Sequence, residues 1–365
     1  MDLLPPRGPE QAEELARAGA LVLDLLPSPA ETPSDSEVAG TIRTAALLGG
    51  ERALSVIRRF RGETRPAAVQ ELDDAWGRFD ARTYSDAVLA DATLGAGVLT
   101  VRTPEQLACL EDLDQYERLR LFGIRTIPAE VASRRGLRDL YVLDSPDLTD
   151  IEPLAALRGL THLSLNDCRG MSDLGPLSDL ALKSLFTIGT PRVTLGILDR
   201  LPGLTALGLG GTGGLPSVGE FPGLPALTGL WLYEGTEDMS LDGLERWPDL
   251  DILSVTGSRQ SHELRTVRRP PDLTRLQMIH HHDLDPAELL RFPRLATLWL
   301  ADCRLTAGTG AWRELTGLTS LTFSACHTVD LTPLAGLPEL TVHVYRGTEV
   351  LGADPFPPER LLLKA

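Results

Sequence analysis

The chain has 365 residues, of which 42% are hydrophobic and 24% are charged, as in soluble globular proteins. Its formal net charge is -16, and lysine occurs only at positions 183 and 364, so we expect no basic groove for nucleic acid and no affinity for anionic membranes. Apolar runs are too short to cross a bilayer. The N-terminus has no basic stretch leading into an apolar one, so we expect a cytoplasmic protein.

Residues 1–92 are predicted to form an α-helical domain. Apolar residues recur at helical spacing, as at Val69, Leu72 and Trp76. The predicted helices cover residues 10–26, 37–48, 53–62, 67–79 and 84–92, with a linker rich in proline and serine at 27–36. Ser36 is the expected N-cap of the second helix, and glycines 49 and 50 are expected to end it.

From residue 93 onward one pattern repeats every 22 or 23 residues, after a first step of 21. The pattern is LxxLxLxx followed by a small polar residue, most clearly from Leu160 to Cys168. Its first position is occupied by Tyr116, Leu137, Leu160, Leu182, Leu204, Leu227, Leu250, Leu273, Leu295, Leu318 and Leu340. This period predicts an α/β leucine-rich-repeat solenoid, a right-handed horseshoe with parallel strands on its concave face. We therefore assign residues 93–365 to a leucine-rich-repeat domain of about 11 repeats.

Alternation along each predicted strand separates core residues from surface residues. In the third repeat Leu163 and Leu165 are expected in the core, so the residues between such leucines face the concave side. Eleven strands would form a face on the order of 50 Å long, which suits a macromolecular ligand. The candidate protein-binding residues on this face are Arg118, Arg120, Tyr141, Phe186, Trp231, Tyr233, Glu234, Arg275, Trp299 and Asp302. The alternative is that the aromatic residues only shield the sheet.

Two further sets of equivalent positions, one residue per repeat, lie in the turns between the predicted strands. Asp150 and Asp330 precede short proline-containing segments, where a carboxylate accepts hydrogen bonds from the first backbone amides of a turn. The position eight after the start of each repeat holds small side chains such as Ser145, Cys168 and Cys303. Hydroxyl and thiol groups satisfy buried backbone groups less fully than an asparagine amide, so we expect a slightly irregular spine of buried thiols and hydroxyls.

No motif indicates catalysis, so we expect neither enzyme activity nor a cofactor. The most metal-like cluster is His280 to His282 with Asp283, but consecutive residues cannot all face one ion, and His281 falls in the inward column. A metal-dependent enzyme is therefore the least favoured alternative. The segment from Gly208 to Gly213 matches GxGxxG without the helix that a dinucleotide site requires, so we interpret it as a glycine-lined dip in the concave face.

Two resemblances add to this interpretation. The segments 148–157 and 331–337 resemble the short leucine-rich repeats of internalins. Residues 48–54, 69–76 and 79–89 resemble the helical segment that joins the nucleotide-binding domain of actinobacterial NACHT (STAND-type) NTPases to their repeats. That resemblance implies the C-terminal sensor half of a defence or signalling NTPase. The sequence thus predicts a non-catalytic sensor for a protein ligand, with an internalin-like surface adhesion protein as the alternative.

Overall fold

The computed structural model describes residues 18–29, 34–92, 97–211, 217–234, 239–257, 264, 267, 270–281, 284–306 and 309–364. The chain divides into two compact units, which we name unit 1 (Met1–Gly123 with Pro128–Leu140) and unit 2 (Ile124–Ile127 with Tyr141–Ala365). Unit 1 contains the helices and also the first strands of the sheet. The predicted domain boundary at residue 92 marks where the repeats begin, and it stays a prediction.

The helices up to residue 92 follow the predicted segments with shifted ends, and two short helices, α6 (Pro104–Ala108) and α7 (Ala129–Ala132), were not predicted. Residues 18–25 are helical, and the earlier part of the first predicted helix lies outside the described residues. The next helices are α2 (Asp35–Leu48), α3 (Gly50–Arg58), α4 (Pro66–Ala75), α5 (Ala81–Tyr84), α6 (Pro104–Ala108) and α7 (Ala129–Ala132), with short turns η2 (Trp76–Arg78), η3 (Ser85–Leu89) and η4 (Leu110–Asp112). Trp76 and Tyr84 are fully buried among them, and each donates a hydrogen bond to a backbone carbonyl.

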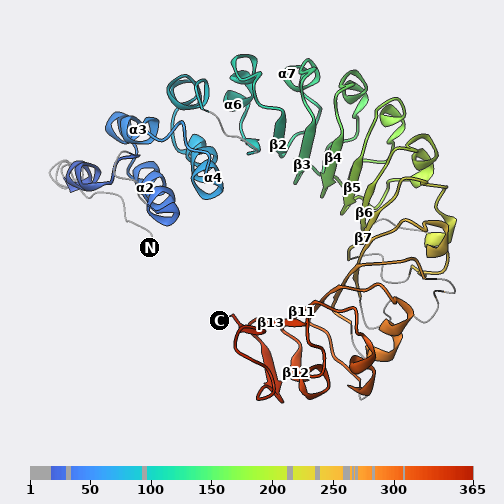
Figure 1. Ribbon diagram of the computed structural model, residues 1–365. Helices are drawn as coiled ribbons and strands as arrows, with labels where there is room; N and C mark the ends of the chain where they lie inside the picture. Colours follow the sequence, from blue (N-terminus) through green and yellow to red (C-terminus); the bar gives the residue numbers. More distant parts are fainter. Residues whose placement is uncertain are drawn as a thin grey trace. The chain divides into compact units, whose positions relative to one another are not determined.

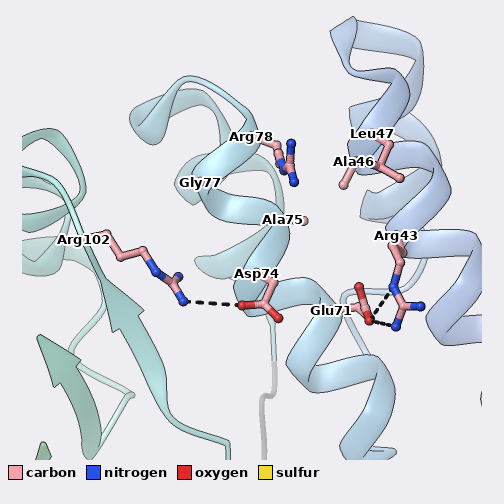
Figure 2. A pocket seen from close by; sticks show the side chains of 9 residues that line it. All are labelled: Arg43, Ala46, Leu47, Glu71, Asp74, Ala75, Gly77, Arg78 and Arg102. Atoms are coloured by element: carbon pink, nitrogen blue, oxygen red, sulfur yellow. Dashed lines mark hydrogen bonds and ion pairs between the residues drawn. The ribbon is translucent and has the colours of Figure 1, made fainter. Parts of the chain in front are cut away.

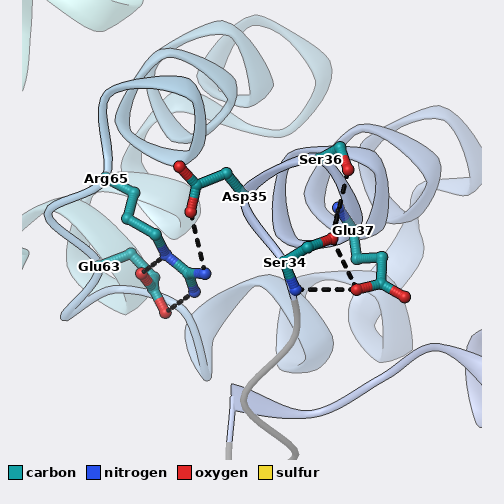
Figure 3. A network of polar contacts seen from close by, with 6 residues as sticks. All are labelled: Ser34, Asp35, Ser36, Glu37, Glu63 and Arg65. Atoms are coloured by element: carbon teal, nitrogen blue, oxygen red, sulfur yellow. Dashed lines mark hydrogen bonds and ion pairs between the residues drawn. The ribbon is translucent and has the colours of Figure 1, made fainter.

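The start of α2 differs from the prediction. Its N-cap is Ser34, because only Ser34 has a glutamate three residues later with which it forms a reciprocal capping box. The Glu37 backbone N–H donates to the Ser34 hydroxyl over 3.4 Å, and the Ser34 N–H donates to the Glu37 carboxylate over 2.8 Å. Figure 3 also shows Arg65 between Glu63 and Asp35, at 2.8 and 3.4 Å, which ties the start of α2 to the turn before α4.

Thirteen parallel strands form one sheet in chain order. The eleven strands that follow the predicted repeat starts are β2 (Arg118–Phe122), β3 (Asp139–Leu143), β4 (His162–Asn166), β5 (Ser184–Ile188), β6 (Ala206–Gly210), β7 (Gly229–Leu232), β8 (Ile252–Thr256), β9 (Arg275–Ile279), β10 (Thr297–Ala301), β11 (Ser320–Ser324) and β13 (Thr341–Val344). β1 (Leu99–Val101) precedes them and β15 (Leu361–Leu363) follows. The predicted leucine-rich-repeat solenoid is therefore confirmed.

The core of unit 2 is built from ladders of equivalent leucines. Leu163, Leu185 and Leu207 are Cα partners on β4, β5 and β6, and all three are at most 1% exposed. Full burial of one leucine side chain stabilises the fold by about 2 kcal/mol. Because each repeat packs only against its neighbours, this gain recurs from turn to turn along the solenoid.

Short 3-10 turns return the chain between strands, on the side opposite the sheet (Figure 1). They are η5 (Glu152–Ala156), η6 (Gly175–Leu177), η7 (Leu195–Arg200), η8 (Val218–Glu220), η9 (Leu244–Arg246), η11 (Pro286–Arg291), η12 (Thr309–Glu314) and η13 (Thr332–Leu334). The Asp150 carboxylate accepts the Glu152 N–H at 2.7 Å, and Asp330 accepts the Thr332 N–H at 2.9 Å, as predicted. Near the C-terminus, β12 (His327–Asp330) and β14 (Thr348–Leu351) form a separate two-stranded sheet.

The spine column satisfies backbone groups with hydroxyls and thiols, as expected. The Ser145 hydroxyl accepts the Ile124 N–H at 3.1 Å and donates to the Leu143 carbonyl at 2.9 Å. The Cys303 thiol lies 3.3 Å from the carbonyl oxygens of Met278 and Ala301. Three members of the column, Thr212, Gly235 and Ser258, lie outside the described residues.

A column of left-handed residues immediately precedes the spine. A positive φ turns the chain sharply at the end of most strands, which normally favours glycine. In this column, Asp144 has a φ of 48° and Asp167 one of 54°. The full set of described left-handed residues in the column is Gly123, Asp144, Asp167, Gly189, Gly211, His280, Asp302, Ala325 and Gly347. Within the described ranges, no helix is long and apolar enough to traverse a bilayer.

Candidate functional site

The concave face of unit 2 consists of the outward positions of β4–β11 and β13, on the inner side of its arc in Figure 1. Its central column runs through the middle residues of the strands, which are direct Cα partners of one another. The column is Ser164, Phe186, Gly208, Trp231, Ser254, Gln277, Trp299, Thr322 and His343. The predicted residues Phe186, Trp231 and Trp299 thus share one column.

Phe186 and Trp231 form an aromatic pair above β6. Their ring centroids lie 5.5 Å apart, although the two strands are not neighbours, because Gly208 stands between them. A Cβ atom at position 208 would lie only 2.0 Å from the Phe186 ring. A Cβ atom at Gly229 would similarly lie 2.5 Å from the indole of Trp231. The glycine-lined dip expected at this point is therefore filled by aromatic rings in the described part of the segment, up to residue 211.

The other predicted aromatic residues differ in exposure. Trp299 is 45% exposed and stands between Gln277 and Thr322, so its indole is the most accessible aromatic surface of the central column. Tyr141 is half-buried at the middle of β3, and Tyr233 is half-buried directly after β7. Burial raises the pKa of Tyr233, so its phenol stays a neutral hydrogen-bonding group at physiological pH.

The concave face is almost uncharged, although the chain carries a net charge of -16. With histidine counted as neutral, Arg275 is the sole charged residue at the outward positions of these described strands. Its guanidinium lies 2.6 Å from the Asp251 carboxylate, and this hydrogen bond is the main cause of the lowered pKa of Asp251. Ser254 donates to the Gln277 side chain over 3.3 Å, so the floor between the two tryptophans is polar but neutral.

Acidic residues line the edge of this face, where the strands turn away. Asp144, Asp167 and Asp302 occupy the left-handed column, and Glu234 lies at the equivalent end of β7. Asp302 is itself engaged, because its carboxylate lies 2.8 Å from Nδ1 of His280 in the neighbouring repeat. The predicted residues Glu234 and Asp302 therefore lie on a charged rim and not in the uncharged centre of the face.

Two of the predicted arginines belong to unit 1 and are described with it. Arg118 pairs with Asp139 at 3.0 Å. Arg120 lies at the next outward position of β2 and is half-buried. Unlike Arg118, it forms no ion pair or hydrogen bond with any residue that the structure describes.

Unit 1 also has a cavity of about 610 Å³ between α2 and α4. Figure 2 shows the side chains that line it. Arg43 of α2 donates to Glu71 of α4 over 2.9 Å, and Arg102 approaches Asp74 at 3.7 Å. These pairs join α2, α4 and the end of β1 electrostatically. Arg102 and Asp74 are both exposed, so their pair contributes little to stability, whereas in the other pair only Arg43 is exposed and the Glu71 side chain is largely buried.

The metal and thiol candidates have structural positions. His281 is 2% exposed, so it points inward as predicted. His280 is hydrogen-bonded to Asp302. His282 and Asp283 lie outside the described residues. Among the described residues, no group of three or more histidines, cysteines or carboxylates could hold a metal ion. All four cysteines are buried free thiols, which agrees with the interpretation of the spine.

Two functional features escaped the sequence analysis. The first is Asp73 on α4, which reads as one polar residue of an amphipathic helix but is 2% exposed and bonded to β1. The second is Arg134, whose guanidinium donates to the carbonyls of Leu110, Leu113 and Tyr116 within 2.8 Å. No pattern in the sequence distinguishes Arg134 from its exposed neighbour Arg135.

Comparisons with known proteins place these features among leucine-rich-repeat structures. No protein-family model matches the sequence, and no curated protein is significantly similar to it. The internalin inlF of Listeria monocytogenes has 16% sequence identity, covers 87% of this chain and 97% of its own, and has a TM-score of 0.39. Internalin C2 of the same organism has 17% sequence identity, covers 71% of this chain and 84% of its own, and has a TM-score of 0.25. The structure of a TLR13–ssRNA13 complex has 20% sequence identity, covers 72% of this chain and 41% of its own, and has a TM-score of 0.48. These low similarities carry no argument about function.

Proposed function

We propose that this leucine-rich-repeat protein is a non-catalytic sensor module that binds a protein ligand through the concave face of unit 2. The observation that carries the proposal is the central column, in which Phe186, Trp231 and Trp299 line a nearly uncharged sheet. The cores of protein interfaces are rich in aromatic residues and poor in charge. An uncharged strip on so acidic a chain has the composition expected of such a core.

Within this face, Trp299 is the primary anchor and the Phe186–Trp231 pair is a preformed platform. An aromatic residue that is already exposed and held on a rigid sheet loses little conformational freedom on binding. The acidic rim formed by Asp144, Asp167, Glu234 and Asp302 favours a ligand with basic residues around an apolar centre. The shielding role of Phe186 and Trp231 is compatible with binding, because both residues are half-buried and keep part of their surface exposed.

At a finer level, we propose that the module is cytoplasmic and forms the sensor half of a NACHT-type defence or signalling NTPase. The support is the resemblance of residues 48–89 to the helical segment of actinobacterial NACHT proteins. An immunoblot of native cell lysate tests this, since a band much heavier than 39.5 kDa is expected. A band at that mass, or staining of intact cells with the same antibody, would favour a free-standing or surface-exposed binding protein instead.

Affinity capture with matched variants tests the concave face directly. The Trp231→Ala and Trp299→Ala double variant should lose the captured partner, because one hot-spot aromatic residue contributes about 2 kcal/mol or more. Leu351→Ala is the control, since Leu351 is 51% exposed on the two-stranded sheet, away from the central column. If the double variant binds the captured partner as tightly as the wild type, this face is not the binding site.

A further inference from the structure

We propose that the protein ligand of unit 2 presents a proline-rich segment flanked by basic residues, which lies in the polyproline II conformation along the central column from Trp231 to Trp299. The inference rests on the proposed function, because it specifies the chemistry of the ligand for the same face. Polyproline II segments typically bind shallow surfaces lined by aromatic residues. The shape of the aromatic surface, the polar groups between the tryptophans and the charge at the edge all favour such a segment.

The aromatic platform lies flat on the sheet. The Phe186 ring covers Gly208, where an added Cβ atom would lie 2.0 Å from it. The Trp231 indole covers Gly229, where an added Cβ atom would lie 2.5 Å from it. The two rings are inclined by 44° with centroids 5.5 Å apart, so they form one shallow aromatic surface. The pyrrolidine ring of proline is apolar and rigid, so it packs on such a surface with little loss of conformational freedom.

The accessible polar groups from one tryptophan to the other are hydrogen-bond donors. Ser254 and Gln277 stand between the two tryptophans in the central column. Ser254 is 2% exposed, and its hydroxyl donates to Oε1 of Gln277 at 3.3 Å. This hydrogen bond leaves the amide N–H groups of the half-buried Gln277 for a ligand. The indole N–H groups of Trp231 and Trp299 also donate to no residue that the structure describes. A ligand here must therefore supply acceptors and few donors.

A polyproline II segment has this composition. Its carbonyl groups form no internal hydrogen bonds, and each proline lacks an N–H group. A β-strand would bring N–H groups that find no acceptors here, and an α-helix satisfies most of its carbonyls internally. Trp231 and Trp299 lie three strands apart, or about 14 Å along the sheet. Two pairs of prolines one turn apart extend over about 12 Å, so one short segment reaches both tryptophans.

The charge at the edge of the face determines the flanks of the segment. Glu234 is exposed on the acidic rim, three positions after Trp231. At the opposite end of the strands, the Arg275 guanidinium is already paired with Asp251 at 2.6 Å. An arginine or lysine beside the prolines would therefore pair with Glu234, whereas an acidic flank would be repelled by the rim.

Fluorescence anisotropy with labelled peptides and the full chain tests the proposal. The probe has eight prolines with two arginines at each end, and its control peptide has alanines in place of the prolines. We expect saturable binding of the proline peptide with a Kd below about 1 mM. The alanine peptide should bind at least about tenfold more weakly, because it is not preorganised and brings N–H groups. A proline peptide with glutamates in place of the arginines should also bind at least about tenfold more weakly at low salt.

Substitutions separate the donor groups from the aromatic surface. Trp299→Phe keeps an aromatic ring but removes the indole N–H, so it should weaken binding of the proline peptide about fivefold. Gln277→Leu removes the amide donors and should have an effect of similar size. Trp299→Ala should weaken binding at least about thirtyfold. Leu351→Ala is the control and should leave binding unchanged, and thermal unfolding verifies that each variant is folded.

Competition with the captured partner distinguishes this inference from the proposed function. We expect the proline peptide to displace that partner from the full chain. If the proline peptide binds no better than the alanine peptide while capture still depends on Trp231 and Trp299, the inference is overturned and the proposed function stands. The inference is also wrong if Trp299→Phe and Gln277→Leu both leave proline-peptide binding unchanged. If neither peptide binding nor capture depends on Trp231 and Trp299, both proposals are wrong.

Discussion

The Phe186 ring lies directly over Gly208 and meets the Trp231 indole on the other side of that strand. The contact exists because the central residue of β6 has no side chain. Any larger residue at position 208 would have to displace the Phe186 ring, since the added Cβ would lie 2.0 Å from it. The geometry of the platform is therefore determined by a glycine that makes no contact of its own with a ligand.

Gly208→Ala should destabilise the protein by about 1–3 kcal/mol, the usual cost of overpacking a filled site. Urea unfolding measures the change, and tryptophan fluorescence reports the displacement of the aromatic pair. Gly223→Ala is the control, because its added Cβ would meet nothing within 4 Å. Equal stabilities for the two variants would show that the Phe186 ring moves aside freely.

Arg134→Leu should destabilise unit 1 by about 3 kcal/mol or more. The Arg134 side chain is 4% exposed and donates to three carbonyls, which would be left buried without donors. Burial lowers the pKa of Arg134 and the charge of Asp114, 3.3 Å away, raises it, so the ion pair and the three accepting carbonyls together compensate the buried charge. Chemical denaturation of Arg135→Leu, the exposed neighbour, should show a change within about 0.5 kcal/mol.

Asp73→Asn should stabilise the protein at neutral pH. Burial raises the pKa of Asp73 above 3.8, so the folded state binds this proton more tightly than the unfolded state does. Its contribution to stability is full below the unfolded pKa and declines as pH rises through the folded pKa. Unfolding free energies measured from acid to neutral pH should show a variant advantage that grows with pH and vanishes in acid. An advantage independent of pH would mean that ionisation of Asp73 is not its cause.

The cysteines should not react with a thiol reagent in the native protein. Burial raises the pKa of Cys168 to about 12, which leaves almost no thiolate at neutral pH. A hydrogen bond with Cys303 lowers the pKa of Cys326, but Cys326 is only 2% exposed. Labelling at pH 8 should therefore modify the thiols after denaturation only. Native labelling at Cys326 would reveal opening of the spine at the tenth and eleventh repeats.

Binding kinetics should separate the centre of the concave face from its rim. Trp299→Ala should accelerate dissociation of the captured partner, since it removes an apolar anchor. Glu234→Gln should instead slow association and reduce its dependence on salt, since a rim charge mainly steers the encounter. Surface plasmon resonance at several ionic strengths distinguishes these effects. The division would be contradicted if both variants changed only the dissociation rate.

The repeat period predicted much of the fold, because core leucines must recur at fixed spacing to form ladders such as Leu163, Leu185 and Leu207. The left-handed column was not predicted. Its signal is visible in retrospect, since glycine or aspartate stands before the spine residue in most repeats, as Asp167 stands before Cys168. The sequence does not identify Ala325 as left-handed, because alanine rarely adopts that conformation.

The assignment of the candidate binding residues to this face remains a prediction, and the structure adds relationships that a single repeat does not contain. Phe186 and Trp231 are 45 positions apart in the sequence, and their contact depends on what stands between them in the sheet. Asp73 could not be recognised because its importance arises from the distant Thr100 amide. Interactions within one period could be inferred from the sequence, whereas those that join different periods required the fold.

The alternation of the strands also separates stability from recognition during evolution. Gln277 and Thr322 are half-buried and each stands between buried neighbours on its strand, so they can change without disturbing the core ladders. The concave face can therefore diversify at small thermodynamic cost and follow a changing ligand. The region of Phe186, Gly208 and Trp231 lacks this freedom, because a change at one of the three requires a compensating change at another. Variation among descendants of this chain should consequently concentrate from β9 to β11.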